Sequence, residues 1–276
     1  MLLSRQERVE KIIKGKNLFL IAGPCVIESE QHATMMAREI KQIAQQVDIA
    51  YIFKASFDKA NRTSINSFRG IGVEEGLRIL DQIRREFDLP VLTDIHDIEQ
   101  AEMAAEFVDI LQIPAFLCRQ TDLVVAAGRT GSVVNVKKGQ FLAPWDMQNV
   151  VKKLESVGCQ NIILTERGAS FGYNNLVVDM RSFPIMREFG HPVVFDVTHS
   201  LQRPGGLGTV TGGDSQFIEN LARAGVACGV DGVFMEVHDN PSVALSDGPN
   251  ALPLKRLKPL LTTLKKIDDL VKEEIY

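Results

Sequence analysis

Eight apolar stretches rich in β-branched residues recur along the chain, and each carries a chemically functional residue at or near its end. The stretches are residues 18–25, 51–56, 90–96, 109–115, 133–138, 162–167, 192–199 and 232–238. Continuous apolar runs of this kind are typical of strands buried in a parallel sheet. The polar residues they carry are Cys25, Lys54, Asp94, His96, Gln112, Lys137, Arg167, His199, Glu236 and His238. Packing alone does not explain polar side chains repeated at one end of every strand, so the pattern indicates a functional face.

Helical spacing of apolar residues fills the segments between these strands. Residues 73–87 show it clearly, and residues 146–158 place Asp146 as a capping residue and Gly158 as a stop. Residues 254–275 keep one apolar face and predict a final helix packed on the sheet. Alternating strands and helices predict a single (β/α)₈ TIM barrel with its active site at the C-terminal ends of the strands. A doubly wound open sheet is the second interpretation, but it gathers functional groups at one switch point.

The chain reads as one domain, because no Gly/Ser linker or low-complexity segment divides its 276 residues. We assign residues 17–276 to the catalytic barrel and residues 1–16 to an N-terminal extension that closes the barrel floor. Two long glycine-containing segments, residues 57–72 and 200–215, follow the second and seventh strands. Loops of this length are uncommon unless they bind or cover a ligand.

Composition narrows the class of protein. The formal net charge is −4 with both signs interspersed, which predicts no nucleic-acid partner. The apolar runs are too short to cross a bilayer, and the first residues lack a secretory signal, so we expect a cytoplasmic protein without membrane attachment. The four cysteines form no CxxC pair, and we expect Cys118, Cys159 and Cys228 to be semi-buried thiols.

Cationic side chains at strand ends predict an anion site. Barrel closure would turn Lys54, Lys137 and Arg167 toward one mouth, where a buried charge requires a partner. Arg62 and Arg119 follow the second and fourth strands and could hold a second anion through bidentate hydrogen bonds. Two phosphate-sized sites in one mouth imply a reaction between two phosphorylated substrates.

A second constellation carries metal-ligand chemistry. It comprises Cys25, His199, Glu236 and Asp247. Thiolate, imidazole and carboxylate together suit Zn, Fe or Mn, whereas Mg²⁺ favours oxygen ligands alone. The spacing of these residues matches neither a zinc finger nor an HExxH motif. The same residues also fit a packed thiol, a core histidine and a helix-capping aspartate. Barrel closure favours the metal site, because strands one, seven and eight are then neighbours.

Six ordered motifs carry a family resemblance. They are FKASFDKANRTS (53–64), QIPAFLCRQTDL (112–123), NVKKGQFLAPWD (135–146), TERGASFGYNNLVVD (165–179), DVTHSLQ (196–202) and DGVFMEVH (231–238). Together they resemble the 3-deoxy-D-manno-octulosonate 8-phosphate synthases from about residue 17 to the end. The resemblance implies a (β/α)₈ fold, a homotetramer, and condensation of phosphoenolpyruvate with arabinose 5-phosphate for lipopolysaccharide synthesis.

The same resemblance distributes roles along the chain. Phosphoenolpyruvate binding is implied for Lys54, Lys59, Gln112, Ala115, Lys137 and Arg167, and binding of the sugar phosphate for Asn61, Arg62, Thr63 and Ser64. Phe116 and Arg119 are expected to reach a neighbouring subunit's site. Lys59 and His199 are candidates for proton transfer, with Asp247 as an assisting base; the sequence does not rank them.

Metal dependence divides this family, and Cys25 resembles the metal-dependent kind, which implies Cys25, His199, Glu236 and Asp247 as ligands of Zn, Fe or Mn. The loop at Pro204 to Gly206 also resembles that kind. The segment LSDGPN, residues 245–250, partly resembles the CDGP run of metal-free members, with Ser246 in place of its cysteine. The sequence is therefore intermediate between the two kinds.

Two alternative functions remain open. A related synthase that uses erythrose 4-phosphate shares the chemistry, although the segment KANRTS, residues 59–64, favours the five-carbon sugar. A non-catalytic barrel that binds phosphosugar or metal is the alternative from a different class, and binding without turnover would identify it.

Overall fold

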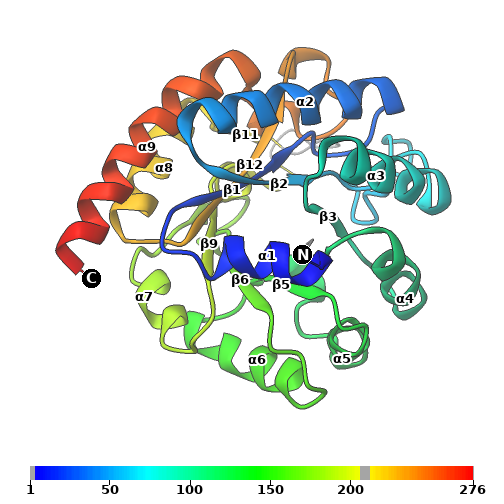
Figure 1. The fold of residues 1–276 in the computed structure, drawn as a ribbon, viewed down its shortest axis with the longest axis horizontal. Coiled ribbons are helices and arrows are strands. Elements are labelled where there is room, and N and C mark those ends of the chain that lie inside the picture. Colours follow the sequence, from blue (N-terminus) through cyan, green and yellow to red (C-terminus); the bar gives the residue numbers. More distant parts are fainter. Residues whose placement is uncertain (1–3, 206–211, 276) are drawn as a thin grey trace.

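The computed structural model describes residues 4–205 and 212–275. Within these residues, eight parallel strands follow one another around a closed barrel (Figure 1). The strands are β1 (Phe19–Gly23), β2 (Ala50–Lys54), β3 (Val91–Asp94), β4 (Ile110–Ile113), β5 (Val133–Lys137), β6 (Ile162–Glu166), β9 (Val193–Asp196) and β12 (Gly232–His238). Pairing of β1 with β12, in the register Phe19 to Gly232, closes the sheet. The predicted TIM barrel is confirmed and the open sheet is wrong.

Helices surround the barrel and connect its strands. They are α2 (Glu30–Val47), α3 (Val73–Phe87), α4 (Ile98–Phe107), α5 (Thr121–Arg129), α6 (Met147–Glu155), α7 (Ser182–Arg187), α8 (Ile218–Ala227) and α9 (Leu254–Ile275). The predicted boundaries of the helices at 73–87 and 254–275 are confirmed. No helix in the described ranges is both long and apolar enough to span a lipid bilayer.

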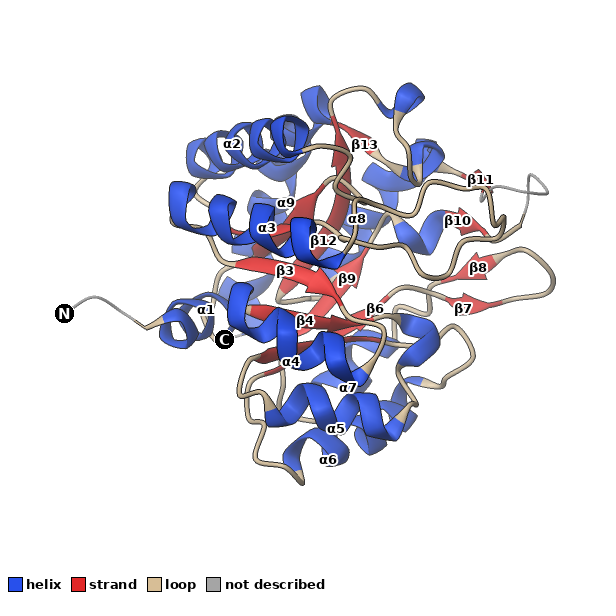
Figure 2. Ribbon diagram, turned by 90° about the vertical axis from the view of Figure 1, so that its right-hand side faces the viewer, coloured by secondary structure: helices blue, strands red, loops and turns tan. Residues whose placement is uncertain are grey.

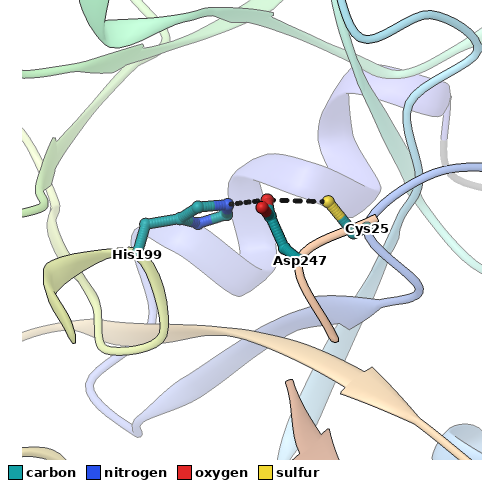
Figure 3. A group of neighbouring side chains, drawn as sticks. All are labelled: Cys25, His199 and Asp247. Carbon is teal, nitrogen blue, oxygen red and sulfur yellow. Dashed lines mark hydrogen bonds and ion pairs between the residues drawn. The ribbon is translucent and has the colours of Figure 1, made fainter. Parts of the chain in front are cut away.

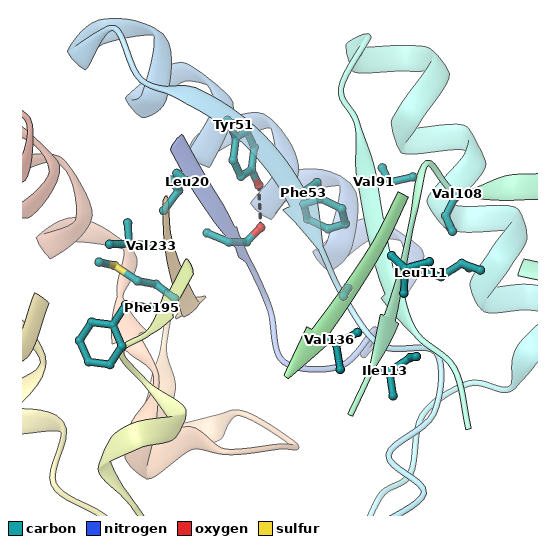
Figure 4. Close-up of a cluster of buried hydrophobic side chains, with 14 of the residues drawn as sticks. Leu20, Tyr51, Phe53, Val91, Val108, Leu111, Ile113, Val136, Phe195 and Val233 are labelled. Atoms are coloured by element: carbon teal, nitrogen blue, oxygen red, sulfur yellow. Dashed lines mark hydrogen bonds between the residues drawn. The ribbon is translucent and has the colours of Figure 1, made fainter. Parts of the chain in front are cut away.

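Two apolar layers stabilise the barrel, because successive side chains of a strand point to opposite faces. Leu20, Phe53 and Leu111 face outward and pack beneath the helices (Figure 4). Ile21 and Ile52 belong to the separate cluster that fills the interior. Tyr51 lies in the outer layer, and its hydroxyl donates a 3.1 Å hydrogen bond to the Ala22 carbonyl (Figure 4).

An N-terminal helix, α1 (Arg5–Ile13), lies at the end of the barrel where the strands begin (Figure 2). Ser4 caps it through a reciprocal capping box with Glu7. Val9 and Ile13 are buried in the same cluster as the interior residues of the barrel strands. The apolar side of α1 therefore packs against the interior of the barrel.

Two small antiparallel hairpins lie at the opposite end, beyond the C-terminal ends of the strands (Figure 2). One pairs β7 (Ala169–Ser170) with β8 (Leu176–Val177), and the other pairs β10 (Gln202–Arg203) with β11 (Gly212–Gly213). A short strand, β13 (Leu252–Pro253), pairs with the end of β12. These additions build a rim around the mouth of the barrel.

Two local predictions are wrong. The side chain of Asp146 makes no capping hydrogen bond, because this residue is already helical in the 3₁₀ turn Pro144–Asp146 that leads into α6. Cys228 is exposed, whereas Cys118 and Cys159 are buried. All four cysteines are free thiols, as expected for a chain without a disulfide framework.

Candidate active site

A cavity of about 730 Å³ opens at the C-terminal ends of the strands. Most residues to which the sequence assigned substrate or proton chemistry line it: Lys54, Lys59, Asn61, Arg62, Thr63, Gln112, Ala115, Phe116, Lys137, Arg167, His199 and Asp247. They come from strand ends and from the loops that follow them, where the active sites of this barrel class lie. One cavity therefore gathers residues spread over nearly two hundred positions of sequence.

Cys25, His199 and Asp247 lie close together (Figure 3), and His199 and Asp247 line this cavity. Oδ2 of Asp247 lies 3.2 Å from Sγ of Cys25 and 3.5 Å from Nε2 of His199. One potential ligand atom from each of the three falls within 4.8 Å of the others. Such a grouping of sulfur, nitrogen and oxygen donors is chemically suited to a transition metal.

Local structure explains how Cys25 reaches this position. Strand β1 ends at Gly23, and a Cβ built there would lie 2.0 Å from the carbonyl oxygen of Lys54. Only glycine allows the two neighbouring strands to approach so closely at that point. The chain then turns, and Sγ of Cys25 meets Oγ of Ser246 at 3.0 Å. Burial, reinforced by the charge of Asp247, raises the pKa of the Cys25 thiol to about 12.

Asp196 connects His199 to the cation Lys137. Its Oδ2 lies 2.7 Å from Nδ1 of His199 and 2.6 Å from Nζ of Lys137, and its side chain is fully buried. Burial alone would raise the pKa of Asp196, but the charges of His199 and Lys137 outweigh it and hold that pKa well below its usual range. The ionised carboxylate accepts a hydrogen bond from Nδ1 of His199, which turns Nε2 toward Asp247.

The fourth predicted ligand, Glu236, lies beside this group and is not one of its three members. Its Oε1 accepts a 2.8 Å hydrogen bond from Nζ of Lys54 and lies 3.6 Å from Nε2 of His199. Its Oε2 is buried and has no hydrogen-bond partner in the described part of the chain. A buried carboxylate oxygen without a partner carries a desolvation cost that a bound cation would remove. The donor set and this free oxygen therefore fit a divalent metal.

A line of polar side chains crosses the barrel interior beneath the cavity. Nε2 of Gln112 donates to Asp94, Nδ2 of Asn135 donates to Gln112 at 2.8 Å, and Oγ1 of Thr165 donates to Asn135 at 2.7 Å. These residues come from the adjacent strands β3, β4, β5 and β6. Each amide is fixed on both sides, so the orientation of Gln112 at the cavity floor is set before any ligand binds.

Arg167 supplies an unpaired cationic donor. It follows β6, and its Nη2 donates a 2.5 Å hydrogen bond to Oε1 of Gln202. Its Nη1 is buried and has no partner within residues 4–205 and 212–275. Burial lowers the pKa of Arg167, and burial likewise lowers the pKa of Lys137 despite the attraction of Asp196. Both cations are therefore held in surroundings where an incoming anion would stabilise them.

The loop after β2 forms the outer part of the cavity. Arg62 is held in place because Nε donates to the Phe68 carbonyl at 2.9 Å and Nη2 to the Leu245 carbonyl at 3.1 Å. Lys59 lies half-buried at the base of this loop. Burial alone would lower its pKa, but Cys25, Asp94, Glu236 and Asp247 together raise it. Lys59 is consequently a cation in the ligand-free site.

Some predicted residues are not part of the cavity lining, and others lie at its exposed edge. Ser64 is absent from its lining and accepts a hydrogen bond from the Asn66 amide at 3.3 Å. Arg119 is also absent from the lining and is exposed, while the neighbouring side chain of Phe116 is 53% exposed. Pro204 lines the cavity, whereas Gly206 of the same predicted loop lies outside the described residues.

Sequence reasoning missed three contributors to this geometry. Asp196 lies within a predicted strand and resembles any buried polar residue, while Asn135 is hidden in the same way within β5. Ser246 was noted only as a departure from a motif, yet it contacts the Cys25 thiol. The sequence did offer a signal for Asp196 and Asn135, because each is a polar residue within an apolar strand. A buried polar side chain of this kind needs a hydrogen-bond partner.

Comparisons with known proteins agree with this arrangement. The family model described as the DAHP synthetase I family matches residues 3–273. The chain belongs to this family. A 2-dehydro-3-deoxyphosphooctonate aldolase of Trichlorobacter lovleyi is 63% identical over 258 residues, which cover 94% of this chain and 95% of the relative.

Two further relatives carry the same name. The protein of Geobacter metallireducens is 64% identical over 258 residues, covering 94% of this chain and 95% of its own length. The protein of Geobacter sp. strain M21 is 62% identical over 263 residues, covering 95% and 96%. Similarity therefore extends over nearly the whole length of the chain.

Proposed function

We propose that this family member condenses phosphoenolpyruvate with D-arabinose 5-phosphate and water to give 3-deoxy-D-manno-octulosonate 8-phosphate and inorganic phosphate, for lipopolysaccharide synthesis. The observation that carries the proposal is the buried Nη1 of Arg167, which has no partner in the described residues and belongs to a side chain that lines the cavity. The name shared by the relatives supports the same reaction.

Two groups of side chains would bind the two phosphorylated substrates. Lys54, Lys59, Gln112, Ala115, Lys137 and Arg167 would bind phosphoenolpyruvate at the inner end of the cavity, and Asn61, Arg62, Thr63 and Ser64 would bind the sugar phosphate near the mouth. Holding both substrates in one cavity removes the entropy cost of bringing two molecules together and aligns the reacting carbons. Arg62 supports this division, because its backbone contacts fix it at the outer loop.

The reaction forms one carbon–carbon bond, forms one carbon–oxygen bond from water, and breaks the carbon–oxygen bond to phosphate. C3 of the enol attacks the aldehyde carbon while water adds at C2. The resulting hemiketal phosphate then expels inorganic phosphate with its bridging oxygen. Lys59 and His199 are the candidates for moving the protons, and Asp247 is an assisting base, since all three line the cavity. Bridging ¹⁸O of phosphoenolpyruvate should therefore appear in the released phosphate, and its appearance in the sugar acid would refute C–O cleavage.

A divalent metal fits the side of the cavity where Cys25, His199 and Asp247 meet. These three residues and Glu236 would hold it, and zinc, iron or manganese would suit the donors. When bound, such a metal supplies Lewis-acid polarisation of an oxygen. The protein's own contribution is to keep His199 in the required tautomer through Asp196.

The direct test is phosphate release from phosphoenolpyruvate with arabinose 5-phosphate. We expect activity that disappears after chelation and returns with manganese or zinc. Erythrose 4-phosphate serves as the competing aldehyde, and a higher kcat/KM with it would replace the proposed substrate. Activity that persists after verified metal removal would keep the reaction but refute the metal requirement. Ligand binding with no turnover for either aldehyde would favour a non-catalytic barrel.

We further propose a homotetramer in which Phe116 and Arg119 reach a neighbouring subunit's site. The exposure of both residues, and the absence of Arg119 from its own cavity lining, support this arrangement. Mixing Arg119→Ala with Lys137→Ala subunits tests it. Each hybrid would contain intact shared sites, so activity should recover above that of either parent. No recovery in verified hybrid tetramers would refute a shared site.

A further inference from the structure

A second group of metal-ligating side chains lies outside the cavity lining. It consists of Glu28, His32 and His238, each of which offers a ligand atom within 4.8 Å of the other two. Glu28 and His32 flank the start of α2, while His238 ends β12. The closing pair of strands, β1 and β12, brings these distant segments together. The group shares no residue with the one formed by Cys25, His199 and Asp247.

The atoms of this group face one another closely. Nε2 of His238 lies 3.3 Å from Oε1 of Glu28, and the two imidazole rings lie 4.6 Å apart between centroids. The side chains of Glu28, His32 and His238 are only 17%, 15% and 5% exposed. Such burial is unusual for surface residues that happen to be neighbours, because each polar side chain has lost most of its contact with water.

One nitrogen of His32 is left without a partner. Its Nε2 lies 3.0 Å from Oδ1 of Asp239, which can accept the ring proton there. Its Nδ1 is buried and makes no hydrogen bond to any described residue. A neutral imidazole with one nitrogen bonded to a carboxylate and the other carrying a free lone pair has the usual form of a metal ligand.

Asp239 is placed to serve both histidines. Its Oδ1 also lies 3.0 Å from Nδ1 of His238. In the ligand-free group, the Asn240 amide donates to this same Nδ1 at 3.0 Å, so the ring proton is on Nε2 and points to Glu28. A cation at Nε2 requires the ring proton on Nδ1, where the hydrogen bond from the Asn240 amide would be lost and the proton would lie beside Oδ1 of Asp239.

We propose that Glu28, His32 and His238 form a second divalent-metal site, with Asp239 as the carboxylate that orients the imidazole of His32. Two imidazoles and one carboxylate suit zinc, cobalt and similar borderline transition metals better than Mg²⁺ or Ca²⁺, which favour oxygen ligands. The three protein ligands leave a position for water in a four-coordinate site.

The second site is connected to the active-site loop through Glu28. Its Oε1 accepts a 2.8 Å hydrogen bond from the Leu245 amide. Leu245 immediately precedes Ser246, which contacts Cys25, and Asp247, which lies between Cys25 and His199 (Figure 3). A cation at the second site would fix the Glu28 carboxylate and with it the start of this loop.

Cobalt titration of the chelator-treated protein tests the proposal, because cobalt reports its ligands spectroscopically. Bound cobalt is measured by equilibrium dialysis, and a thiolate-to-cobalt absorption band reports occupancy of the Cys25 site alone. We expect two cobalt ions per chain in the unaltered protein. His32→Gln should weaken the ion that gives no thiolate band at least about tenfold and leave the band unchanged.

His191→Gln is the matched control, because His191 also pairs with a carboxylate, at 3.6 Å from Glu155, but belongs to neither group. It should retain both ions. Circular dichroism and the urea midpoint verify that each variant is folded, and Glu28→Gln repeats the test on a second ligand. If the unaltered protein binds only one cobalt ion, the second site is still supported when that ion gives no thiolate band and is lost in His32→Gln. Two results would overturn the proposal. One is that His32→Gln keeps all of its cobalt that gives no thiolate band, and the other is that the unaltered protein binds no such cobalt.

Discussion

Oδ2 of Asp196 lies 2.7 Å from Nδ1 of His199, and this contact fixes which nitrogen of the imidazole faces Cys25 and Asp247. The same oxygen lies 2.6 Å from Nζ of Lys137, a cation that we assign to phosphoenolpyruvate. The Asp196 carboxylate therefore positions both His199, a proposed metal ligand, and Lys137, a proposed phosphoenolpyruvate ligand. Asp196 touches no proposed ligand itself, so we regard it as a positioning residue.

Asp196→Asn should affect metal and substrate binding together. The amide is uncharged, and its NH₂ group must take the place either of Oδ2, which faces Nδ1 of His199 and Nζ of Lys137, or of Oδ1, which accepts from the His199 amide, so a donor then faces a donor. We expect metal affinity to fall about 10- to 100-fold, measured by chelator competition, and KM for phosphoenolpyruvate to rise. Asp214→Asn is the control, because Asp214 pairs with the exposed Arg203. Unchanged metal affinity in Asp196→Asn would contradict the positioning role.

Lys54→Met should strongly destabilise the chelator-treated protein. Nζ of Lys54 lies 2.8 Å from Oε1 of Glu236, and both side chains are only 1% exposed. Removing the cation leaves a buried carboxylate without its partner, which costs about 3–5 kcal/mol in the free energy of unfolding. Urea denaturation measures this loss. Arg69→Met breaks the pair between the exposed Arg69 and the partly buried Asp58 and should cost no more than about 1 kcal/mol. Equal losses in the two variants would refute the role of burial.

Asp94 should make stability depend on pH on the acid side. Burial alone would raise its pKa, but Lys54, Lys59 and Lys137 outweigh burial and hold the pKa of Asp94 well below the ordinary 3.8. The unfolded chain therefore takes up this proton at higher pH than the folded chain. The contribution of Asp94 to stability is present above pH 3.8 and is lost as pH falls through and below that value.

Urea denaturation at several acidic pH values tests this dependence. Asp94→Asn should show a shallower fall in the free energy of unfolding as the solution is acidified, whatever its stability at neutral pH. Asp179→Asn is the control, because its exposed pair with Arg181 is screened by solvent and should change the slope little. An unchanged slope in Asp94→Asn would show that the lowered pKa has no effect on folding.

We propose that residues 1–16 close the floor of the barrel, and Ile13→Ala should therefore destabilise it. Ile13 is 2% exposed and packs with the interior residues of the strands. Loss of its side chain should lower the free energy of unfolding by about 2–5 kcal/mol, measured with urea. The kcat of the folded fraction should not change, since the cavity lies at the other end. Leu270→Ala, at a position 60% exposed, should have little effect on either quantity.

The order of strands and helices could be predicted because it depends on local pattern. The apolar stretch at residues 133–138 contains β5 with Lys137 at its end, and the predicted helix at 73–87 coincides with α3. The role of a single residue was harder to predict, because it depends on the conformation of its neighbours. The 3₁₀ turn Pro144–Asp146 makes Asp146 helical, so its side chain does not cap α6.

By itself, the sequence determined that strands alternate with helices, that Cys25, Lys137, Arg167 and His199 stand at or just after strand ends, and that six ordered motifs resemble those of the 3-deoxy-D-manno-octulosonate 8-phosphate synthases. Only the tertiary structure decided which of these side chains meet. Asp247 contacts Cys25 across 222 positions, and His238 contacts Glu28 across 210. Closure of β1 on β12 creates both contacts, and a pattern that repeats every few residues holds no information about contacts so distant in the chain.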